Sequence, residues 1–364
     1  MLRLIHTKGR QQMDNQIDTP ERIPTMWNFA AIWNQSLDQN RQRPYEKRKH
    51  IWASEITGSY YDRYWKMQGR KPTTPPNLRS RRKFEGGNMA EYVMQQVLYR
   101  AGILQSSQEY ITNEDYGIRV TGKADFTAGG TPRLLEDEDL FGLPESFVAI
   151  AKETIEHLKE KYPNGLKNLN IEIKSCSGMM FDLYERAPAV HHSMQAFHYA
   201  HNTDKPTLLV YVSRDDFRVC EWTIMPDSTK HLDIYKTDLD NMKKVLKLNK
   251  KQILNYREPL LVWNDEDHKF KKNFKVEYSS YLTDYGFEQP AEYAEPATNI
   301  ATRINNVIKR LRTGAKMSKL NEIAMEDAIK FFPPCEEKLI KYINEWHVMD
   351  KPEPEKKPKK EKKV

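Results

Sequence analysis

The sequence has few cysteines and no long apolar run. Its three cysteines, Cys176, Cys220 and Cys335, are far apart, which argues against a disulfide framework and against a four-thiolate metal site. No stretch of 18 apolar residues occurs, so we expect no membrane span. The first eight residues lack an apolar core long enough for a secretory signal. We therefore expect a cytoplasmic protein.

Several signatures of common enzymes are also missing. The chain shows no Ser-His-Asp order, no glycine loop of the kind that cradles phosphates, no helicase motif and no internal repeat. At 364 residues it is nevertheless long enough for one large domain or two modest ones. Nucleophilic-serine chemistry and nucleotide-driven motor activity are therefore not expected.

Positive charge is present but unevenly placed. The net charge is +7, and the segment 351–364 holds seven lysines and three glutamates, so this tail carries more than half of the excess. A pI near 9.0 is typical of proteins with an acidic partner such as nucleic acid. Two further basic clusters precede expected helices: Arg41, Arg43, Lys47, Arg48 and Lys49, then Arg79, Arg81, Arg82 and Lys83. We interpret both as loops that could hold a nucleic-acid backbone.

Periodicity predicts an α/β fold, with a small mixed central sheet flanked by helices and followed by a C-terminal helical region. Helices are expected at 85–101, 145–162, 190–202, 228–256 and 297–312, and strands at 169–174, 207–212 and 217–224. Residues 109–120 are expected to form a strand, a turn around 113–117 and a second strand, with 122–126 continuing in extended form. The first helix should bury Met89, Val93 and Val97. Another helix should begin at Ser54.

These elements divide the chain into four segments. Residues 1–50 form an N-terminal extension, 51–256 a core with an insertion at 129–168, 257–350 the C-terminal helical region, and 351–364 a basic tail without order.

The segment Asn170–Ser175 contains the sharpest chemical signal. Residues two apart in a strand point to the same face, so Glu172 and Lys174 project together while Ile171 and Ile173 are buried on the other face. A pair of this kind is commonly a surface ion pair of little energetic value. It is also a minimal apparatus for metal-assisted attack on a phosphodiester.

Other residues could complete such a site. Asp125 follows Gly122 on an expected strand, and Glu91 lies on the 85–101 helix. Carboxylates and carbonyls are the ligands that Mg²⁺ prefers, so we predict that Glu91, Asp125, Glu172 and the carbonyl of Ile173 hold Mg²⁺ or Mn²⁺. Lys174 could orient the attacking water or stabilise developing charge. Gln195 and Tyr199 share a helix face and could bind the phosphate or the lysine.

The order of these motifs resembles the PD-(D/E)XK nuclease superfamily. Gly122-Lys-Ala-Asp125, Glu172-Ile-Lys174 and Gln195-Ala-Phe-His-Tyr199 are similar to the G-x-x-D, E-x-K and Q-x-x-x-Y motifs of the RecB-like exonucleases found in recombination helicases, CRISPR adaptation and phages. The similarity covers about residues 50–225. It implies a restriction-endonuclease-like core, metal ligation by Asp125 and Glu172, and catalysis by Lys174 with Gln195 and Tyr199.

The chain departs from that pattern in three ways. Glu91 stands where relatives often have histidine. Asp125 and Glu172 are 47 residues apart, so residues 129–168 must loop out of a connection that is usually short. Many relatives carry a four-cysteine iron–sulfur cluster, which three scattered cysteines cannot build. We therefore expect no such cluster.

The sequence thus predicts a Mg²⁺-dependent deoxyribonuclease, with exonuclease action favoured, in DNA recombination, repair or phage DNA processing. Its partners would be single-stranded DNA or duplex ends, with other replication or recombination proteins, in the cytoplasm of a bacterial or phage-infected cell. Two alternatives remain open: a nuclease-like protein that binds nucleic acid without cutting it, and a virion-associated interaction protein. His198 and His201 also have a spacing that could hold zinc, although hydrogen-bonded histidines are the simpler interpretation.

Overall fold

The computed structural model falls into two compact units, Met1–Arg43 and Pro44–Val364. It describes residues 29–39, 45–76, 78–136, 142, 144–254, 257–259, 261–264, 269–273, 275–276, 279–285 and 297–312, and the single residues 318, 319, 323 and 326. In the first unit, helix α1 spans Phe29–Gln39. All other described elements belong to the second unit. None of the helices in these ranges is both long and apolar enough to cross a membrane.

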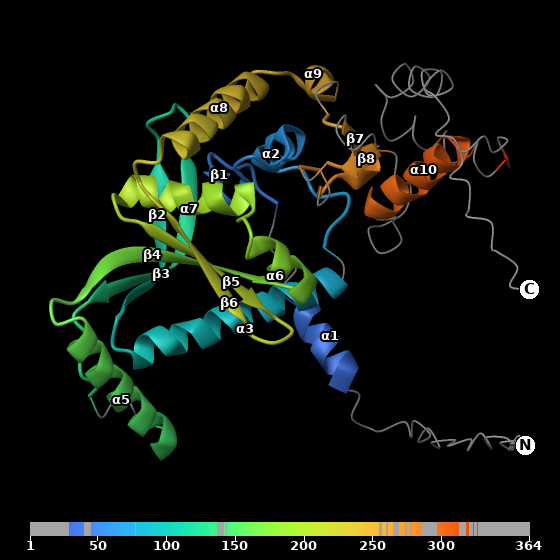
Figure 1. Cartoon of the computed structure of the whole chain (residues 1–364). Helices are drawn as coiled ribbons and strands as arrows, with labels where there is room; N and C mark the ends of the chain where they lie inside the picture. Colours follow the sequence, from blue (N-terminus) through green and yellow to red (C-terminus); the bar gives the residue numbers. More distant parts are fainter. Residues whose placement is uncertain are drawn as a thin grey trace, which may run out of the picture. The chain divides into compact units, whose positions relative to one another are not determined.

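A mixed sheet forms the centre of the second unit (Figure 1). In the described residues β4 lies between β3 and β5, β6 follows β5, β2 pairs with β3, and β1 extends the order beyond β3. The β1–β3 and β4–β5 pairs are parallel and the others antiparallel. The predicted α/β class is confirmed at this level. The strands are β1 (Ile51–Trp52), β2 (Leu104–Asn113), β3 (Val120–Gly130), β4 (Leu166–Cys176), β5 (Thr207–Ser213) and β6 (Val219–Ile224).

Two helices cover opposite faces of the sheet (Figure 1). Helix α7 (Val190–Thr203) covers one face, where Ala124, Leu209 and Tyr211 pack against Phe197 and other side chains of the helix. This side is called the α7 face. Helix α3 (Leu78–Arg100) covers the other side, the α3 face, where Ala90 packs against a second buried cluster. That cluster consists of Phe126, Ala128, Ile171, Ile173, Val210 and Val212.

One edge of β3 is shared by two different strands. β4 pairs with its last residues, from Phe126 to Gly130, and β1 pairs with Val120 and Thr121. β2 occupies the opposite edge along most of the strand. Residues 122–125 therefore have no strand partner on the shared edge, and this gap lies beside Asp125.

The connection between β3 and β4 contains helix α5 (Glu145–Lys161), close to the predicted bounds. Ala151 and Ile155 of α5 are buried with Leu135, and Tyr99 of α3 packs against them. The described part of this connection therefore packs on the end of α3, and β3 and β4 still meet as neighbours.

A separate hydrophobic core, distinct from the clusters on the two faces of the sheet, joins α2 (Tyr60–Met67) to the C-terminal part of the unit. It includes Tyr61, Met242, Phe270, Tyr281 and Ile304. The elements that contribute are α8 (Thr229–Leu246), α9 (Lys250–Leu254), β7 (Leu261–Asn264), β8 (Lys269–Lys272), η2 (Leu282–Tyr285) and α10 (Ala297–Arg312). Short elements near the sheet are η1 (Ala53–Glu55) and α6 (Gly178–Tyr184).

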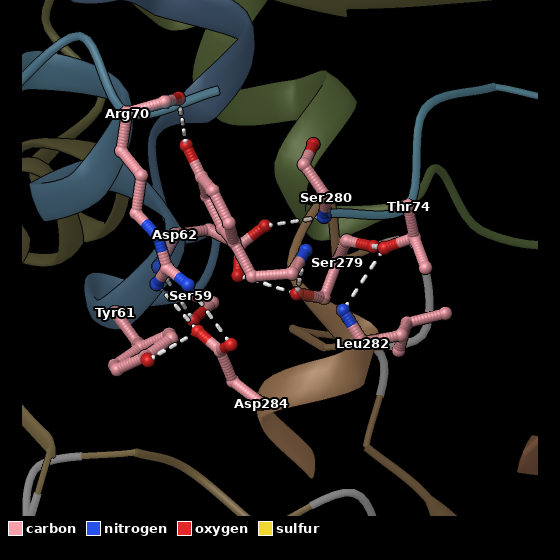
Figure 2. A network of polar contacts seen from close by, with 10 residues as sticks. Ser59, Tyr61, Asp62, Arg70, Thr74, Ser279, Ser280, Leu282 and Asp284 are labelled. Carbon is pink, nitrogen blue, oxygen red and sulfur yellow. Dashed lines mark hydrogen bonds and ion pairs between the residues drawn. The ribbon is translucent and has the colours of Figure 1, made fainter. Parts of the chain in front are cut away.

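Buried polar contacts fix this junction (Figure 2). The carboxylate of Asp62 accepts hydrogen bonds from the Ser279 hydroxyl at 2.6 Å and the Ser280 N–H at 2.8 Å. Arg70 forms two hydrogen bonds to Asp284, at 2.5 and 3.0 Å. Asp62 is buried, and a buried carboxylate is retained only when its hydrogen-bonding capacity is met, so its two contacts favour one docking geometry.

Several predictions of local structure were wrong. Helix α3 begins at Leu78 rather than residue 85, so the basic cluster 79–83 is helical rather than a loop. Met89, Val93 and Val97 are exposed, because the helix buries Ala90 and packs Met94 and Leu98 on the sheet.

The early helix and the C-terminal region also differ from the predictions. Ser59, not Ser54, caps α2 by accepting from the N–H of Asp62. The predicted helix 228–256 is divided into α8 and α9. The C-terminal region contains the β7–β8 hairpin in addition to helix α10. The basic tail 351–364, with Arg41 and Arg43, lies outside the described residues.

Candidate active site

Asp125 and Glu172 lie next to each other at the gap in the sheet. The last antiparallel pair of β3 and β4 is Phe126 with Ile171, so the following residues on the two strands are Asp125 and Glu172. The N–H of Ile173 donates to Oδ2 of Asp125 at 2.7 Å. A side chain thus bridges the strands where the regular ladder stops.

The backbone of β3 changes direction at Asp125. Ala124 packs on the α7 face, whereas Phe126, two residues later, packs on the α3 face. On the neighbouring strand Gln108 has φ of 57°, a left-handed conformation that is uncommon outside glycine. Its side chain also hydrogen-bonds Asp125; burial raises the pKa of that carboxyl, and this hydrogen bond offsets part of the rise. This irregularity explains how the Asp125 side chain can reach into the gap.

Glu172 and Lys174 form an ion pair at the same place. Lys174 Nζ donates to Oε1 of Glu172, and both side chains project from β4 toward the α7 face while Ile171 and Ile173 are buried on the α3 face. The Glu172 side chain is only 2% exposed and that of Lys174 is 22% exposed. The predicted division of this strand into two faces is confirmed, but the pair is not on the surface.

The two oxygens of Glu172 have different environments. Oε1 accepts from Lys174 and from Nε2 of Gln195, the latter at 2.7 Å. Oε2 is buried and has no hydrogen-bond partner among the described residues. An unpartnered buried carboxylate oxygen costs about 1–3 kcal/mol or more, so its presence calls for an explanation.

Gln195 and Tyr199 connect Glu172 to β3. Gln195 Nε2 also donates to the Tyr199 hydroxyl at 2.9 Å. That hydroxyl accepts from the N–H of Lys123 at 3.3 Å and donates to the C=O of Lys123 at 3.1 Å. The predicted pair on one helix face is confirmed. Its tyrosine supplies the hydrogen bonds that a strand would otherwise provide in the gap.

Gly122 allows this close approach of α7. A Cβ at this position would lie 2.4 Å from Cε1 of Tyr199 and 2.8 Å from Cβ of Ala53. No side chain fits at these distances, so glycine is required here because a helix packs directly on the strand.

Glu91 reaches the site from α3. One turn earlier on the same helix, a Cβ on Gly87 would lie 3.4 Å from Oγ of Ser175, which places this side of the helix over β4. Burial and, to a lesser degree, the charge of Asp125 together raise the pKa of Glu91 to about 7, and Lys174 and Lys123 oppose this rise. Glu91 is therefore part of the same electrostatic cluster.

The central groups have shifted pKa values for one shared reason. Burial raises the pKa of Glu172, and the charge and hydrogen bond of Lys174 oppose that rise. Burial likewise raises the pKa of Asp125, although Lys174 and the Ile173 N–H lower it. Burial alone would lower the pKa of Lys174, but Glu172 and Asp125 outweigh it and raise the pKa. Desolvated, mutually coupled groups of this kind are typical of functional sites.

The donor set fits a divalent metal of the Mg²⁺ type. Oxygen ligands from Asp125 and Glu172 are available, including the unpartnered Oε2. In an extended strand the N–H and C=O of one residue face the same neighbour, so the Ile173 carbonyl faces β3 as well. Within the described residues, no three acidic, histidine or cysteine side chains form a ready cage. Glu91 thus interacts with Asp125 and Lys174 through its charge, but the structure does not place it together with Asp125 and Glu172 as a third metal ligand.

The zinc alternative gains no support from His198. Its Nδ1 is 2.8 Å from the Tyr235 hydroxyl and its Nε2 is 3.1 Å from the carbonyl of Ile111. Both ring nitrogens are therefore used inside the core. Burial lowers the pKa of this histidine to about 4, so it is neutral at physiological pH.

Sequence reasoning missed Lys123 and Gln108. Lys123 is held by Tyr199 through its backbone and acts on Asp125 and Glu91 through its charge. Its place between Gly122 and Asp125 in the sequence could have indicated that Lys123 belongs to the site. Nothing in the sequence indicated the left-handed conformation of Gln108.

The chain matches no protein-family model and no curated protein. Among solved structures it is similar to one described as the crystal structure of SSO0001, with a TM-score of 0.37 and 12% identity over 64% of this chain and 93% of that chain. A similarity of this size carries no inference about activity.

Proposed function

We propose that this chain is a metal-dependent deoxyribonuclease, a phosphodiester hydrolase whose central sheet is a restriction-endonuclease-like core. The motifs of the chain resemble those of RecB-like exonucleases. We therefore propose exonuclease action, in recombination, repair or phage DNA processing. Its location would be the cytoplasm of a bacterial or phage-infected cell.

The observation that carries the proposal is the state of Glu172. A carboxylate that is 2% exposed, with one oxygen bound to Lys174 and Gln195 and the other unpartnered, is costly to bury. Replacing such a buried pair with apolar side chains is commonly neutral or stabilising, so stability gives no reason to keep it. A divalent cation shared with Asp125 would satisfy the free oxygen.

Each residue has a definable part in hydrolysis. Asp125, Glu172 and the Ile173 carbonyl would hold a metal ion, which would supply charge neutralisation and activate water for attack. Gln195 fixes Oε1 of Glu172 and so leaves Oε2 available. Lys174, the most exposed member of the ion pair, can orient the attacking water or stabilise developing negative charge on the phosphate.

Tyr199 has a positioning part. Its hydroxyl holds the β3 backbone two residues before Asp125, and Gln195 joins it to Glu172. The separation between the two metal-binding strands is therefore set by one helix. Preorganisation of this kind is what places catalytic groups within the tolerance that chemistry requires.

A cleavage assay tests the proposal. Purified chain is incubated with end-labelled linear DNA, end-blocked linear DNA and closed circular DNA, in Mg²⁺, Mn²⁺ or EDTA. We expect cleavage in either metal, none in EDTA, and protection of the circular and end-blocked substrates.

Asp125→Ala and Lys174→Ala should abolish the activity while circular dichroism shows retained folding. Undiminished cleavage by these variants would contradict the proposal. A wild-type chain that binds DNA but never cuts it would favour the non-catalytic alternative.

A further inference from the structure

Tyr110 is an exposed aromatic residue on β2, next to the strand that carries Asp125. It lies on β2 in register with Lys123 of β3, and 65% of the residue is accessible to solvent. The next residue, Ile111, is buried in the cluster on the α7 face, so the Tyr110 side chain points to the opposite side of the sheet. That side is the one from which Glu91 approaches.

Lys123 joins this tyrosine to the carboxylates. Its ammonium lies 5.6 Å from the centre of the Tyr110 ring, within the range of a cation–π contact. Its charge also acts on Asp125 and Glu91. The backbone of Lys123 is held at both N–H and C=O by Tyr199, so the position of this residue relative to the site is fixed.

The pair has the chemistry of a nucleotide subsite. A flat aromatic ring that remains largely exposed can stack on an unpaired base of any sequence, and a lysine beside it can bind the phosphate of the same nucleotide. Neither group contributes to the core, because Tyr110 is exposed and Lys123 is only half-buried.

We propose that Tyr110 and Lys123 form a substrate-positioning subsite on the α3 side of the gap: the tyrosine stacks on one unpaired base of the strand that reaches Asp125 from that side, and the lysine binds the phosphate of that nucleotide. This inference rests on the proposed nuclease function. It adds that the substrate strand is unpaired where it enters the site.

The chain contains a matched comparison for this pair. Tyr162, 37% exposed, has the ammonium of Lys161 5.5 Å from its ring centre, but it lies at the end of α5, before β4 begins. Single exposed aromatic residues are common on protein surfaces, and this second pair represents that situation. A subsite at Tyr110 must therefore behave differently from Tyr162.

Oligonucleotide binding without metal tests the subsite independently of cleavage. A fluorescein-labelled single-stranded 15-mer is titrated in EDTA with wild type, Tyr110→Ala, Tyr110→Phe, Lys123→Met and Tyr162→Ala. Two further oligonucleotides carry 2-aminopurine, one at the 5′ and one at the 3′ terminal position. Stacking of Tyr110 on that base is then measured as quenching of the 2-aminopurine fluorescence.

We expect Tyr110→Ala to weaken binding at least about fivefold, as loss of one stacked base does, and to lose the quenching. Tyr110→Phe and Tyr162→Ala should stay within about twofold of wild type. Lys123→Met should reduce the salt dependence of binding by about one phosphate contact.

Equal binding by Tyr110→Ala and wild type, or an equal loss in Tyr162→Ala, would overturn the subsite. So would a wild-type chain that fails to bind the oligonucleotide. If wild type binds and quenches as expected yet never cuts DNA in Mg²⁺, the nuclease proposal fails while base stacking at Tyr110 stands.

Discussion

The hydroxyl of Tyr199 lies between the backbone N–H and C=O of Lys123, at 3.3 and 3.1 Å, and so replaces a strand partner with a helix side chain. Because Gln195 joins the same hydroxyl to Glu172, one helix links the two sides of the gap between β3 and β4. The candidate metal ligands Asp125 and Glu172 lie on the two sides of that gap. This relationship leads to the first prediction.

Tyr199→Phe should lower both stability and cleavage. The substitution leaves the Lys123 N–H and C=O and one Gln195 donor without their partner, which should cost about 1–3 kcal/mol in the free energy of unfolding. Cleavage should fall at least about tenfold, because the strands of the proposed metal site lose their spacing. Urea denaturation and single-turnover kinetics measure the two effects.

Tyr235→Phe is the control for that variant. It removes another buried tyrosine hydroxyl, which bonds His198 and does not contact the site. We expect a comparable loss of stability with cleavage nearly unchanged. An equal loss of cleavage in both variants would mean that Tyr199 acts only through overall stability.

Gly122→Ala should lower the free energy of unfolding by about 3 kcal/mol or more, the upper end of the usual cost of overpacking. The added Cβ would meet Tyr199 at 2.4 Å and Ala53 at 2.8 Å, so α7 must move away from β3. Thermal unfolding measures the change. Gly87→Ala is the contrasting variant, since its Cβ meets Ser175 only at 3.4 Å and alanine favours the helix by about 0.5–1 kcal/mol. Equal behaviour of the two variants would contradict the close packing at Gly122.

Stability should fall on acidification because of His198. Its folded-state pKa is about 4 and the ordinary value is 6.5. Between these values the unfolded chain binds a proton that the folded chain does not. The free energy of unfolding therefore drops as pH falls from 6.5 to 4, by about 3 kcal/mol in total for this group, and the contribution is complete above 6.5.

Denaturant unfolding across pH 4–7 checks this prediction. His198→Gln, which can still donate to the Ile111 carbonyl, should show a flatter pH dependence than wild type. The exposed His157→Gln serves as control and should follow wild type. A His198→Gln variant with an unchanged slope would refute the assignment.

Lys174→Met alone should lower stability more than the double substitution of Lys174 and Glu172. Removing the ammonium leaves Glu172 buried without its cation, at a cost of about 3–5 kcal/mol. Glu172→Gln combined with Lys174→Met should recover most of that stability, since neither position then carries a charge that needs its partner. Neither variant should cut DNA. Recovery of cleavage by the double variant would show that the pair is structural.

Much of the candidate site followed from simple periodicities. The two-residue period of β4 placed Glu172 and Lys174 together, and the four-residue spacing on α7 placed Gln195 with Tyr199. Both patterns are local, so they survive whatever the rest of the chain does. The buried state of Glu172 was not predictable, because it depends on α7 packing across the strand.

The errors arose where tertiary packing chooses between local alternatives. Helix α3 has apolar residues on two sides, and the sheet selected Ala90 rather than Met89 because small residues permit the close approach seen again at Gly87. The change of direction at Asp125 depends on Gln108, whose left-handed backbone has no signature in the sequence. Contacts between distant segments, such as Asp62 with Ser279, were equally invisible.

The central claim is that Asp125 and Glu172 hold one divalent cation between β3 and β4. Mn²⁺ binding to the purified chain, followed by electron paramagnetic resonance without DNA, tests it most directly. We predict one bound Mn²⁺ per chain and at least a tenfold weaker affinity in Asp125→Asn and in Glu172→Gln, with Asp215→Asn as an exposed control that binds like wild type. Absence of a bound ion in wild type, or equal affinity in all four proteins, would contradict the account.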